Sequence, residues 1–182
     1  MRKKVKEYSS GMSKKEVIFT ERLQLRIISD SDQDSLVDMF LDDKIIKTYM
    51  IPEFSSKEEA LTLFDHFKNL SASSAHFVYG IYFQNQIIGF INDVEMHGPE
   101  IEIGYVIHPK EQNKGFATEV LNTVIKELFG MGYIVVKAGA FEENLASMRV
   151  MEKCGMKRIL QEDLIEYRGK VHRCINFEIR RT

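Results

Sequence analysis

Cysteine is scarce in this sequence, and the scarcity excludes small domains that are held together by disulfides. Only two cysteines, Cys154 and Cys174, occur among the 182 residues. A disulfide-stabilised scaffold needs a denser and paired set. Both cysteines lie in apolar segments, so we expect free thiols in the core of a protein from a reducing compartment. Neither is expected to be a covalent nucleophile.

Long apolar runs and an excess of one charge are also lacking. The sequence has no apolar run of about 18 residues, the length that predicts a transmembrane helix. Residues 1–15 are basic but lack the apolar core of a signal peptide. The net charge of −2 favours neither direct nucleic-acid binding nor adsorption to an anionic membrane. A cytoplasmic location is the expectation that remains.

The composition suits one globular domain. Hydrophobic residues make up 44% and charged residues 29% of the chain, enough for a real core under a charged surface. We predict a single domain over residues 17–182. Residues 1–16 hold six Lys and Arg side chains and a Ser-Ser-Gly break, which favours a flexible basic leader. A contact of this leader with RNA or a partner is the alternative.

The most informative stretch covers residues 100–119. Residues 100–107 alternate acidic and aliphatic side chains and then become apolar, as a strand does when it enters a core. Pro109 ends this strand because proline cannot donate to a sheet. From Gly115 onward, apolar residues recur every three to four positions, which predicts a helix.

The join between strand and helix, Q-N-K-G-F-A, predicts a cradle for a pyrophosphate. The first N–H groups of a helix have no intrahelical partner, and the helix dipole favours an anion beside them. Gly115 has no Cβ, so a phosphate can approach the backbone there. An ordinary strand–helix turn is the alternative. A Walker loop and a dinucleotide fingerprint are excluded, because Lys114 precedes the glycine and the loop has one glycine only.

The segment H-P-K-E-Q-N-K-G-F-A-T-E resembles the acyl-CoA loop of the GNAT superfamily of N-acetyltransferases, whose consensus is Q/R-x-x-G-x-G/A. Gln112, Gly115 and Ala117 match it. The E-I-G-Y strand and the later N-x-x-S-x-R-V-x-E-K-C-G-M are similar to the branch that contains the ribosomal-protein N-terminal acetyltransferases. Asn113 stands where the family commonly has glycine, and asparagine tolerates the unusual backbone angles that this position requires.

The resemblance covers residues 19–178 and implies the GNAT fold, an α/β (α+β) architecture. Its central sheet is mixed and mostly antiparallel, with six to seven strands and flanking helices. We expect strands over residues 17–28, 75–83, 86–94, 100–107, 133–140, 156–166 and 172–180. Strands 100–107 and 133–140 are expected to be parallel neighbours that splay apart at their carboxyl ends.

Acetyl-CoA is the cosubstrate that the resemblance implies, and no metal is expected. The pyrophosphate is expected at the loop and the pantetheine arm in the slot between the splayed strands. The Ile107 N–H is also expected to stabilise the oxyanion of the reaction. The implied cofactor-binding residues are Val106, Ile107, Gln112, Asn113, Lys114, Gly115, Phe116, Ala117, Asn144 and Ser147. For Asn144, a helix cap without any ligand is the alternative.

Acyl transfer to an amine also needs a group that takes the proton of the amine. Glu102 in the E-I-G-Y strand is the predicted base, with an exposed glutamate or an ion pair as the alternative. Many family members use a tyrosine seven residues after the position of Asn144 on the side of the leaving thiolate, but Met151 stands there. Ser147, or a water that it orders, is the predicted replacement beside the sulfur of CoA. Tyr49 and Tyr105 are the predicted substrate-binding residues.

The predicted function is acetyl-CoA-dependent transfer of an acetyl group to a primary amine by direct attack in a ternary complex. The acceptor is expected to be a protein N-terminus or a small amine. One alternative is a CoA-binding sensor or interaction module without turnover, since the tyrosine is missing. The other is an enzyme for polyamines or aminoglycosides, which an acidic pocket would favour. The resemblance also allows a homodimer.

Overall fold

The strands pair into one sheet in the order β1-β2-β3-β4-β5-β6-β8-β7 in the computed structural model, which describes residues 14–182. Neighbouring strands are antiparallel except for β5 and β6, which are parallel. The strands are β1 (Val17–Phe19), β2 (Gln24–Arg26), β3 (Tyr79–Phe83), β4 (Gln86–His97), β5 (Glu100–Ile107), β6 (Val135–Phe141), β7 (Lys157–Tyr167) and β8 (Lys170–Arg180). The helices are α1 (Gln33–Phe40), α2 (Asp43–Ile46), α3 (Lys57–Ala72), α4 (Phe116–Gly130) and α5 (Leu145–Lys153).

Within residues 14–182 the sheet has eight strands, one more than the upper limit of the prediction, because the first expected strand is divided. The N–H of Thr20 donates to the carbonyl of Leu23 at 3.0 Å. The N–H of Leu23 in turn donates to the Thr20 hydroxyl at 2.9 Å. This side-chain-to-backbone bond closes a turn between β1 and β2, and hydrophobic alternation does not report such a turn.

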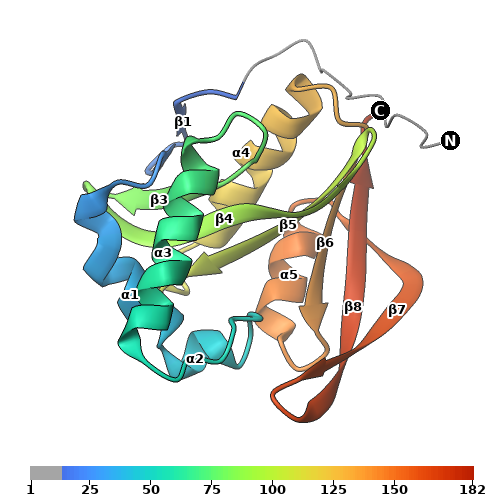
Figure 1. Cartoon of the computed structure of the whole chain (residues 1–182). Helices are drawn as coiled ribbons and strands as arrows, with labels where there is room; N and C mark the ends of the chain where they lie inside the picture. Colours follow the sequence, from blue (N-terminus) through green and yellow to red (C-terminus); the bar gives the residue numbers. More distant parts are fainter. Residues whose placement is uncertain (1–13) are drawn as a thin grey trace, which may run out of the picture.

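Helices cover both faces of the sheet and create two apolar clusters. Ile101 and Ile103 of β5 pack in the cluster beneath α4 and α5, whereas Val106 packs in the cluster with α1, α2 and α3. Side chains of one strand alternate between its faces, so β5 serves both clusters. Figure 1 shows α3 and α4 on opposite sides of the strands. The carboxyl end of β5 is thereby fixed from both faces.

Strands β3 and β4, which the sequence predicts over residues 75–83 and 86–94, are joined in an antiparallel hairpin. Gln84 and Asn85 make the turn with positive φ angles of 48° and 65°. The register shifts beside Gly89, and a Cβ on this glycine would lie 2.1 Å from the carbonyl oxygen of Val106. Gly89 therefore lies both at a bulge and at a close approach of two backbones. The same contact shows that the Val106 carbonyl points toward β4.

Strands β5 and β6 splay apart, as expected. They pair only between residues 100–102 and residues 135–137. Beyond this point β6 continues to pair with β8 as far as Phe141, while β5 runs on toward the start of α4. A wedge of space without a bridging strand follows from this geometry.

The predicted leader lies only partly within the described residues. Residues 1–13 are outside them, whereas Lys14 and Lys15 contact the domain. The Lys14 ammonium donates to the Ser71 carbonyl at 2.5 Å, and Lys15 bonds to Glu127 at 2.8 Å. Burial lowers the pKa of Lys14 to about 8. The chain is thus bound to the domain slightly before the predicted boundary at residue 17.

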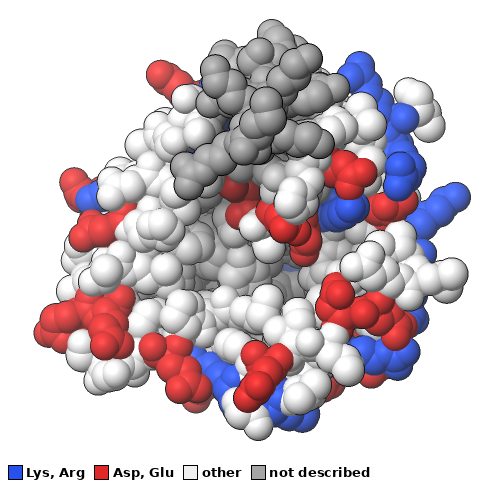
Figure 2. Space-filling model, turned by 45° about the vertical axis from the view of Figure 1, so that its right-hand side comes forward, with Lys and Arg blue, Asp and Glu red and all other residues white. Residues whose placement is uncertain are grey.

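The surface carries charges of both signs. Figure 2 shows basic and acidic side chains interspersed around a central hollow on the face that it presents. Within residues 14–182, no helix is long and apolar enough to cross a membrane. The same residues contain no group of three or more His, Cys, Asp or Glu side chains placed to hold a metal ion.

Candidate active site

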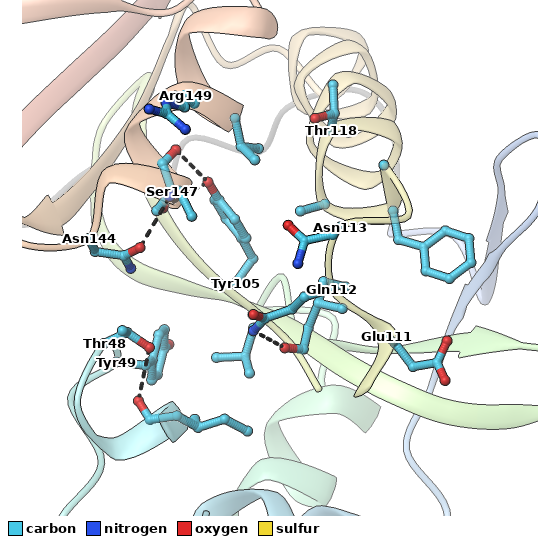
Figure 3. A pocket seen from close by; sticks show the side chains of 18 of the residues that line it. Thr48, Tyr49, Tyr105, Glu111, Gln112, Asn113, Thr118, Asn144, Ser147 and Arg149 are labelled. Atoms are coloured by element: carbon cyan, nitrogen blue, oxygen red, sulfur yellow. Dashed lines mark hydrogen bonds between the residues drawn. The ribbon is translucent and has the colours of Figure 1, made fainter. Parts of the chain in front are cut away.

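A cleft of about 550 Å³ opens between the end of β5, the start of α4, α5 and α2 (Figure 3). It lies at the point where β5 and β6 have separated. The predicted site residues that line it are Tyr49, Tyr105, Val106, Ile107, Gln112, Asn113, Gly115, Phe116, Ala117, Asn144 and Ser147. Lys114 and Glu102 are the predicted residues that the cleft does not include.

The loop before α4 presents backbone N–H groups to this cleft. Asn113 and Gly115 have φ angles of +63° and +81°, so the expectation that asparagine tolerates its position is confirmed. Gly115 is the N-cap of α4, and no side chain of the described residues caps the helix there. The first intrahelical bond runs from the Glu119 N–H to the Gly115 carbonyl at 3.1 Å. The N–H groups of residues 116–118 therefore have no helical acceptor and can bind an anion.

An ion pair outside the cleft holds this loop. The Arg22 guanidinium bonds to the Glu119 carboxylate at 2.7 Å and donates to the Lys114 carbonyl at 3.0 Å. Glu119 lies in the first turn of α4, where a negative charge is favourable to the helix dipole. The Lys114 ammonium is paired with Glu111 at 2.8 Å. Lys114 can thus contribute its backbone to the cradle, whereas its side chain points elsewhere.

Gln112 connects the loop to the end of β5. Its side-chain amide donates to the Ile107 carbonyl at 2.9 Å. The next N–H, that of His108, donates to Ile88 of β4 at 2.7 Å. Because successive backbone groups of a strand point to opposite sides, the N–H of Ile107 faces the splay. The backbone of Val106 faces β4, so its predicted role as a backbone partner for pantetheine does not fit this register.

Phe116 contributes to the cleft in a similarly limited way. The residue is only 3% exposed, and its side chain packs against Phe83, with ring centroids 5.0 Å apart. The Arg22 guanidinium lies 4.6 Å from the centroid of the same ring. The Phe116 ring is therefore an anchor for the helix start, and only its backbone is available to a ligand.

The start of α5 forms the opposite wall. Asn144 caps the helix, with its side-chain oxygen accepting from the Ser147 N–H at 3.1 Å. The Ser147 hydroxyl lies 3.0 Å from the Tyr105 hydroxyl of β5 (Figure 3). Burial raises the pKa of Tyr105 to about 12, so this phenol keeps its proton at neutral pH. Met151, where many family members carry a tyrosine, is buried in the core.

Tyr49 enters the cleft from the segment after α2. Its hydroxyl donates to the Asn92 side chain at 2.6 Å. A Cβ on Gly104 of β5 would lie 2.7 Å from this hydroxyl, so the ring end rests on the strand backbone. Burial holds the pKa of Tyr49 well above its usual value, and the charge of Glu102 adds to this effect. Tyr49 is therefore a neutral donor on the face of β5 that carries Glu102.

Glu102 lies in a second cleft, of about 280 Å³, which strands β4 to β8 line. It occupies the last paired position of β5 and β6, opposite Lys137. Burial raises the pKa of this carboxyl, and the charges of Glu95 and Asp163 raise it further, against a smaller opposing effect of Lys137. The residue that we predicted as the base is thus at the vertex of the splay. It stands on the opposite face of β5 from Tyr105.

Sequence reasoning missed several residues that line the first cleft. Arg149 and Lys153 are one helical turn apart on α5, and Lys44 comes from α2. The helical spacing of Ala146, Arg149 and Lys153 from the cap at Asn144 is a signal that places them on the same face. Their positive charges suit an anionic ligand. No sequence pattern indicates that α2 reaches this wall.

Comparison with known proteins agrees with this geometry. Residues 22–157 match the family model described as the acetyltransferase (GNAT) domain. The uncharacterized N-acetyltransferase YoaA of Bacillus subtilis is 30% identical over 148 residues, which cover 78% of this chain and 83% of YoaA. A solved GNAT-family acetyltransferase from Bacillus anthracis has a TM-score of 0.77 at 25% identity, covering 90% of this chain and 98% of that one.

A second solved structure extends the likeness of fold. The ribosomal L7/L12 alpha-N-protein acetyltransferase RimL, in complex with coenzyme A, has a TM-score of 0.79 at 20% identity. The match covers 91% of this chain and 98% of RimL. At this identity the likeness concerns the fold alone.

Proposed function

Because this chain belongs to the GNAT acetyltransferase family, we propose that it moves the acetyl group of acetyl-CoA to a primary amine. The transfer is a direct attack in a ternary complex. The observation that carries the proposal is the uncapped start of α4, which opens into a cleft at the splay of β5 and β6. An ordinary strand–helix turn needs no such cleft beside its free N–H groups.

The residues around the first cleft fit CoA. The free N–H groups of residues 116–118 suit its pyrophosphate, and Lys44, Arg149 and Lys153 add positive charge along the same walls. The Ile107 N–H faces the splay, where an extended pantetheine arm can bond to the strand edge. Acetyl-CoA, the acetyl donor, is thereby assigned to the face of β5 that carries Tyr105.

The acceptor amine is assigned to the face that carries Glu102. A carboxylate whose pKa is raised by burial is a better proton acceptor near neutral pH than an ordinary glutamate. In the proposed step, the nitrogen lone pair forms a bond to the carbonyl carbon, and the nitrogen proton passes along a chain of water molecules to Glu102. The C–S electron pair returns to sulfur. The Ile107 N–H stabilises the oxyanion that forms in between.

The second cleft favours an acceptor with positive charge. Among the described residues that line it, four carry carboxyl groups and one, Lys137, is a lysine. Glu100 is paired with Lys137 and Glu95 with His97, but the sum of charges remains negative. A polyamine, which carries several positive charges, fits this lining better than a peptide N-terminus, which carries one, so a small cationic amine is the first acceptor to test. A protein N-terminus is the second.

A panel of amines tests the proposal directly. Spermidine, an aminoglycoside and peptides with N-terminal serine or alanine are mixed with acetyl-CoA, and release of the free thiol is followed. We expect amine-dependent release, fastest with spermidine. CoA binding by calorimetry without thiol release from any amine would favour the sensor module instead. Lack of CoA binding would contradict the cradle itself.

Ser147→Ala is expected to lower kcat about tenfold and to leave CoA affinity within about threefold, the effect of one lost hydrogen bond. The backbone N–H of Ser147 still donates to Asn144, so the helix keeps its cap. The Ser147 hydroxyl is proposed to hold the sulfur of the leaving CoA, and the Tyr105 hydroxyl, 3.0 Å away, supports it.

Steady-state kinetics and calorimetry separate these effects. Tyr105→Phe is the companion variant, and the two losses in kcat are expected to be less than additive if the hydroxyls act as a pair. Fully additive losses would show that they act independently. A larger effect of Ser147→Ala on CoA affinity than on kcat would limit the serine to holding the cofactor.

A further inference from the structure

The tip of the β7–β8 hairpin brings one phenol oxygen to backbone groups that are 116 to 121 residues away in sequence. The hydroxyl oxygen of Tyr167 lies 3.0 Å from the Ile46 carbonyl and 3.1 Å from the Ile51 carbonyl. It accepts from the Ile51 N–H at 3.2 Å and from the Arg168 guanidinium at 3.0 Å. One proton and two lone pairs are all that a hydroxyl has, so these contacts use its full capacity.

The segment that Tyr167 contacts has no helix or strand of its own over residues 47–56. Its carbonyls therefore need partners from elsewhere. The Tyr49 carbonyl lies 3.4 Å from the same phenol oxygen, and the Arg168 guanidinium donates to the Pro52 carbonyl at 3.4 Å. A segment whose backbone is bonded by an outside group takes its position from that group.

This segment carries Tyr49 and Thr48 into the first cleft. Tyr49 is thus held at two points, by its hydroxyl at Asn92 and by its backbone at Tyr167. The ring also packs edge-on against Phe90, with centroids 5.4 Å apart at 88°. The hydroxyl bond and the packing orient the side chain, while Tyr167 fixes where the main chain lies.

The same hairpin contacts the opposite wall of the cleft. The His172 ring of β8 stacks on Phe141 with centroids 4.4 Å apart at 23°, and Phe141 lies 5.8 Å from the Tyr167 ring. The Glu142 N–H donates to the backbone of β8 at 2.8 Å. Phe141 and Glu142 lie within three residues before Asn144, the cap of α5. The hairpin tip therefore contacts the segments that carry both walls.

We propose that Tyr167 is a positioning residue for the acceptor: its hydroxyl holds residues 46–51 at a fixed place relative to α5 and so places Tyr49. This inference rests on the proposed function, because it assigns Tyr49 to the acceptor side. The loop that is proposed to bind CoA is held separately, by Arg22 and Gln112. Loss of the Tyr167 hydroxyl therefore affects the acceptor and spares CoA.

Tyr167→Phe removes the hydroxyl and keeps the ring against Phe141. By amide exchange measured by NMR, we expect faster exchange of the Ile51 N–H, by about tenfold, and no change in α4. KM for the amine that supports thiol release, spermidine or a seryl peptide, is expected to rise about five- to tenfold. The Kd of CoA is expected to stay within about twofold, because the loop that is proposed to bind the pyrophosphate is held by Arg22 and Gln112 and not by this segment.

Tyr79→Phe is the matched control. It also loses a long-range bond from a phenol to a backbone carbonyl, at 2.6 Å to Lys15, on a part of the chain outside both clefts. Tyr79→Phe is expected to lower Tm by about as much as Tyr167→Phe does, without changing KM for the amine. In the double variant of Tyr167→Phe with Tyr49→Phe, the rises in KM are expected to be less than additive, since the first acts through the second.

Two results would overturn the inference. One is unchanged exchange at Ile51 in Tyr167→Phe. The other is faster exchange with unchanged KM for the amine, which would reduce Tyr167 to a stabilising contact. Failure of the proposed function looks different, because wild-type protein then releases no thiol with any amine. In that case the exchange of residues 46–51, which needs no acceptor, decides whether Tyr167 positions the segment.

Discussion

Replacing Gly115 by glutamate is expected to lower CoA affinity by at least about a hundredfold, to below detection in a standard titration. The introduced carboxylate lies at the free N–H groups of α4 and can accept from them in place of the pyrophosphate. Its negative charge also repels the phosphates. The effect is large because competition and repulsion act on the same contact.

Backbone strain contributes to this loss and can be measured separately. Gly115 has a φ angle of +81°, where any L-residue is strained by about 1–2 kcal/mol. Among the described residues, an added Cβ would meet only the Arg22 guanidinium, at 3.4 Å, so there is room for it. Gly115→Ala therefore isolates the strain, and we expect it to weaken CoA binding by less than about tenfold.

Gly98→Glu is the control for charge. Gly98 has a φ angle of +57°, and an added Cβ would have no neighbour within 4 Å among the described residues. This variant places the same side chain at another position of positive φ, outside the first cleft. Its CoA affinity is expected to stay within about twofold of wild type, as for a distant and independent site. Calorimetry on variants whose Tm shows them folded makes the comparison, and undiminished binding by folded Gly115→Glu would contradict the cradle.

The part of the fold that the sequence predicts well is encoded by neighbouring residues. The change from alternation to helical spacing at Gly115 places the start of α4 at Phe116. The strand–helix–strand order of β5, α4 and β6 predicts the parallel pair, whereas the splay of that pair is what the family resemblance implies. These signals are local, because burial of one face repeats along each element.

What the sequence leaves out depends on contacts between distant residues. Tyr105 and Ser147 are 42 residues apart, and no periodicity relates them. The orientation of the Val106 backbone follows from the bulge beside Gly89 on another strand. The contact of Tyr167 with residues 46–51 is set by the length of a hairpin. Resemblance to a family predicted which residues gather at the cleft, but it did not predict which atoms they present.

Glu102→Gln is expected to lower kcat by about a hundredfold to ten-thousandfold, the range for loss of a general base. The substitution keeps the size of the side chain and removes its ability to take a proton. CoA affinity is expected to change less than about twofold, because Glu102 does not line the first cleft and is not a neighbour of the cradle. Turnover with the amine identified in the panel, and calorimetry with CoA, measure the two effects.

Glu100→Gln is the matched control. Glu100 lies two residues earlier on the same face of β5 and lines the same second cleft. Its hydrogen bond with Lys137 lowers its pKa, so it is a weaker proton acceptor than Glu102. We expect its kcat to fall by no more than about threefold, as for an exposed ion pair. Equal losses in the two variants would show that the second cleft needs its total charge rather than one base.

The pH dependence gives the sharpest test of the role of Glu102. Burial raises the pKa of Glu102 above its ordinary value of 4.5, and only the carboxylate accepts a proton. The rate is therefore expected to rise with pH through this raised pKa, and Glu102→Gln is expected to lose that limb of the profile.

The free energy of unfolding is expected to change in the opposite direction and to fall as pH rises, because the folded protein binds this proton more tightly than the unfolded chain. The stabilising contribution of the proton is complete below pH 4.5 and is lost as pH rises through the folded pKa. If Glu102→Gln abolishes the rise of the rate with pH and also removes the loss of stability with pH, both effects belong to the Glu102 carboxyl. A rate limb that persists in Glu102→Gln would assign the proton to an ordered water or another group.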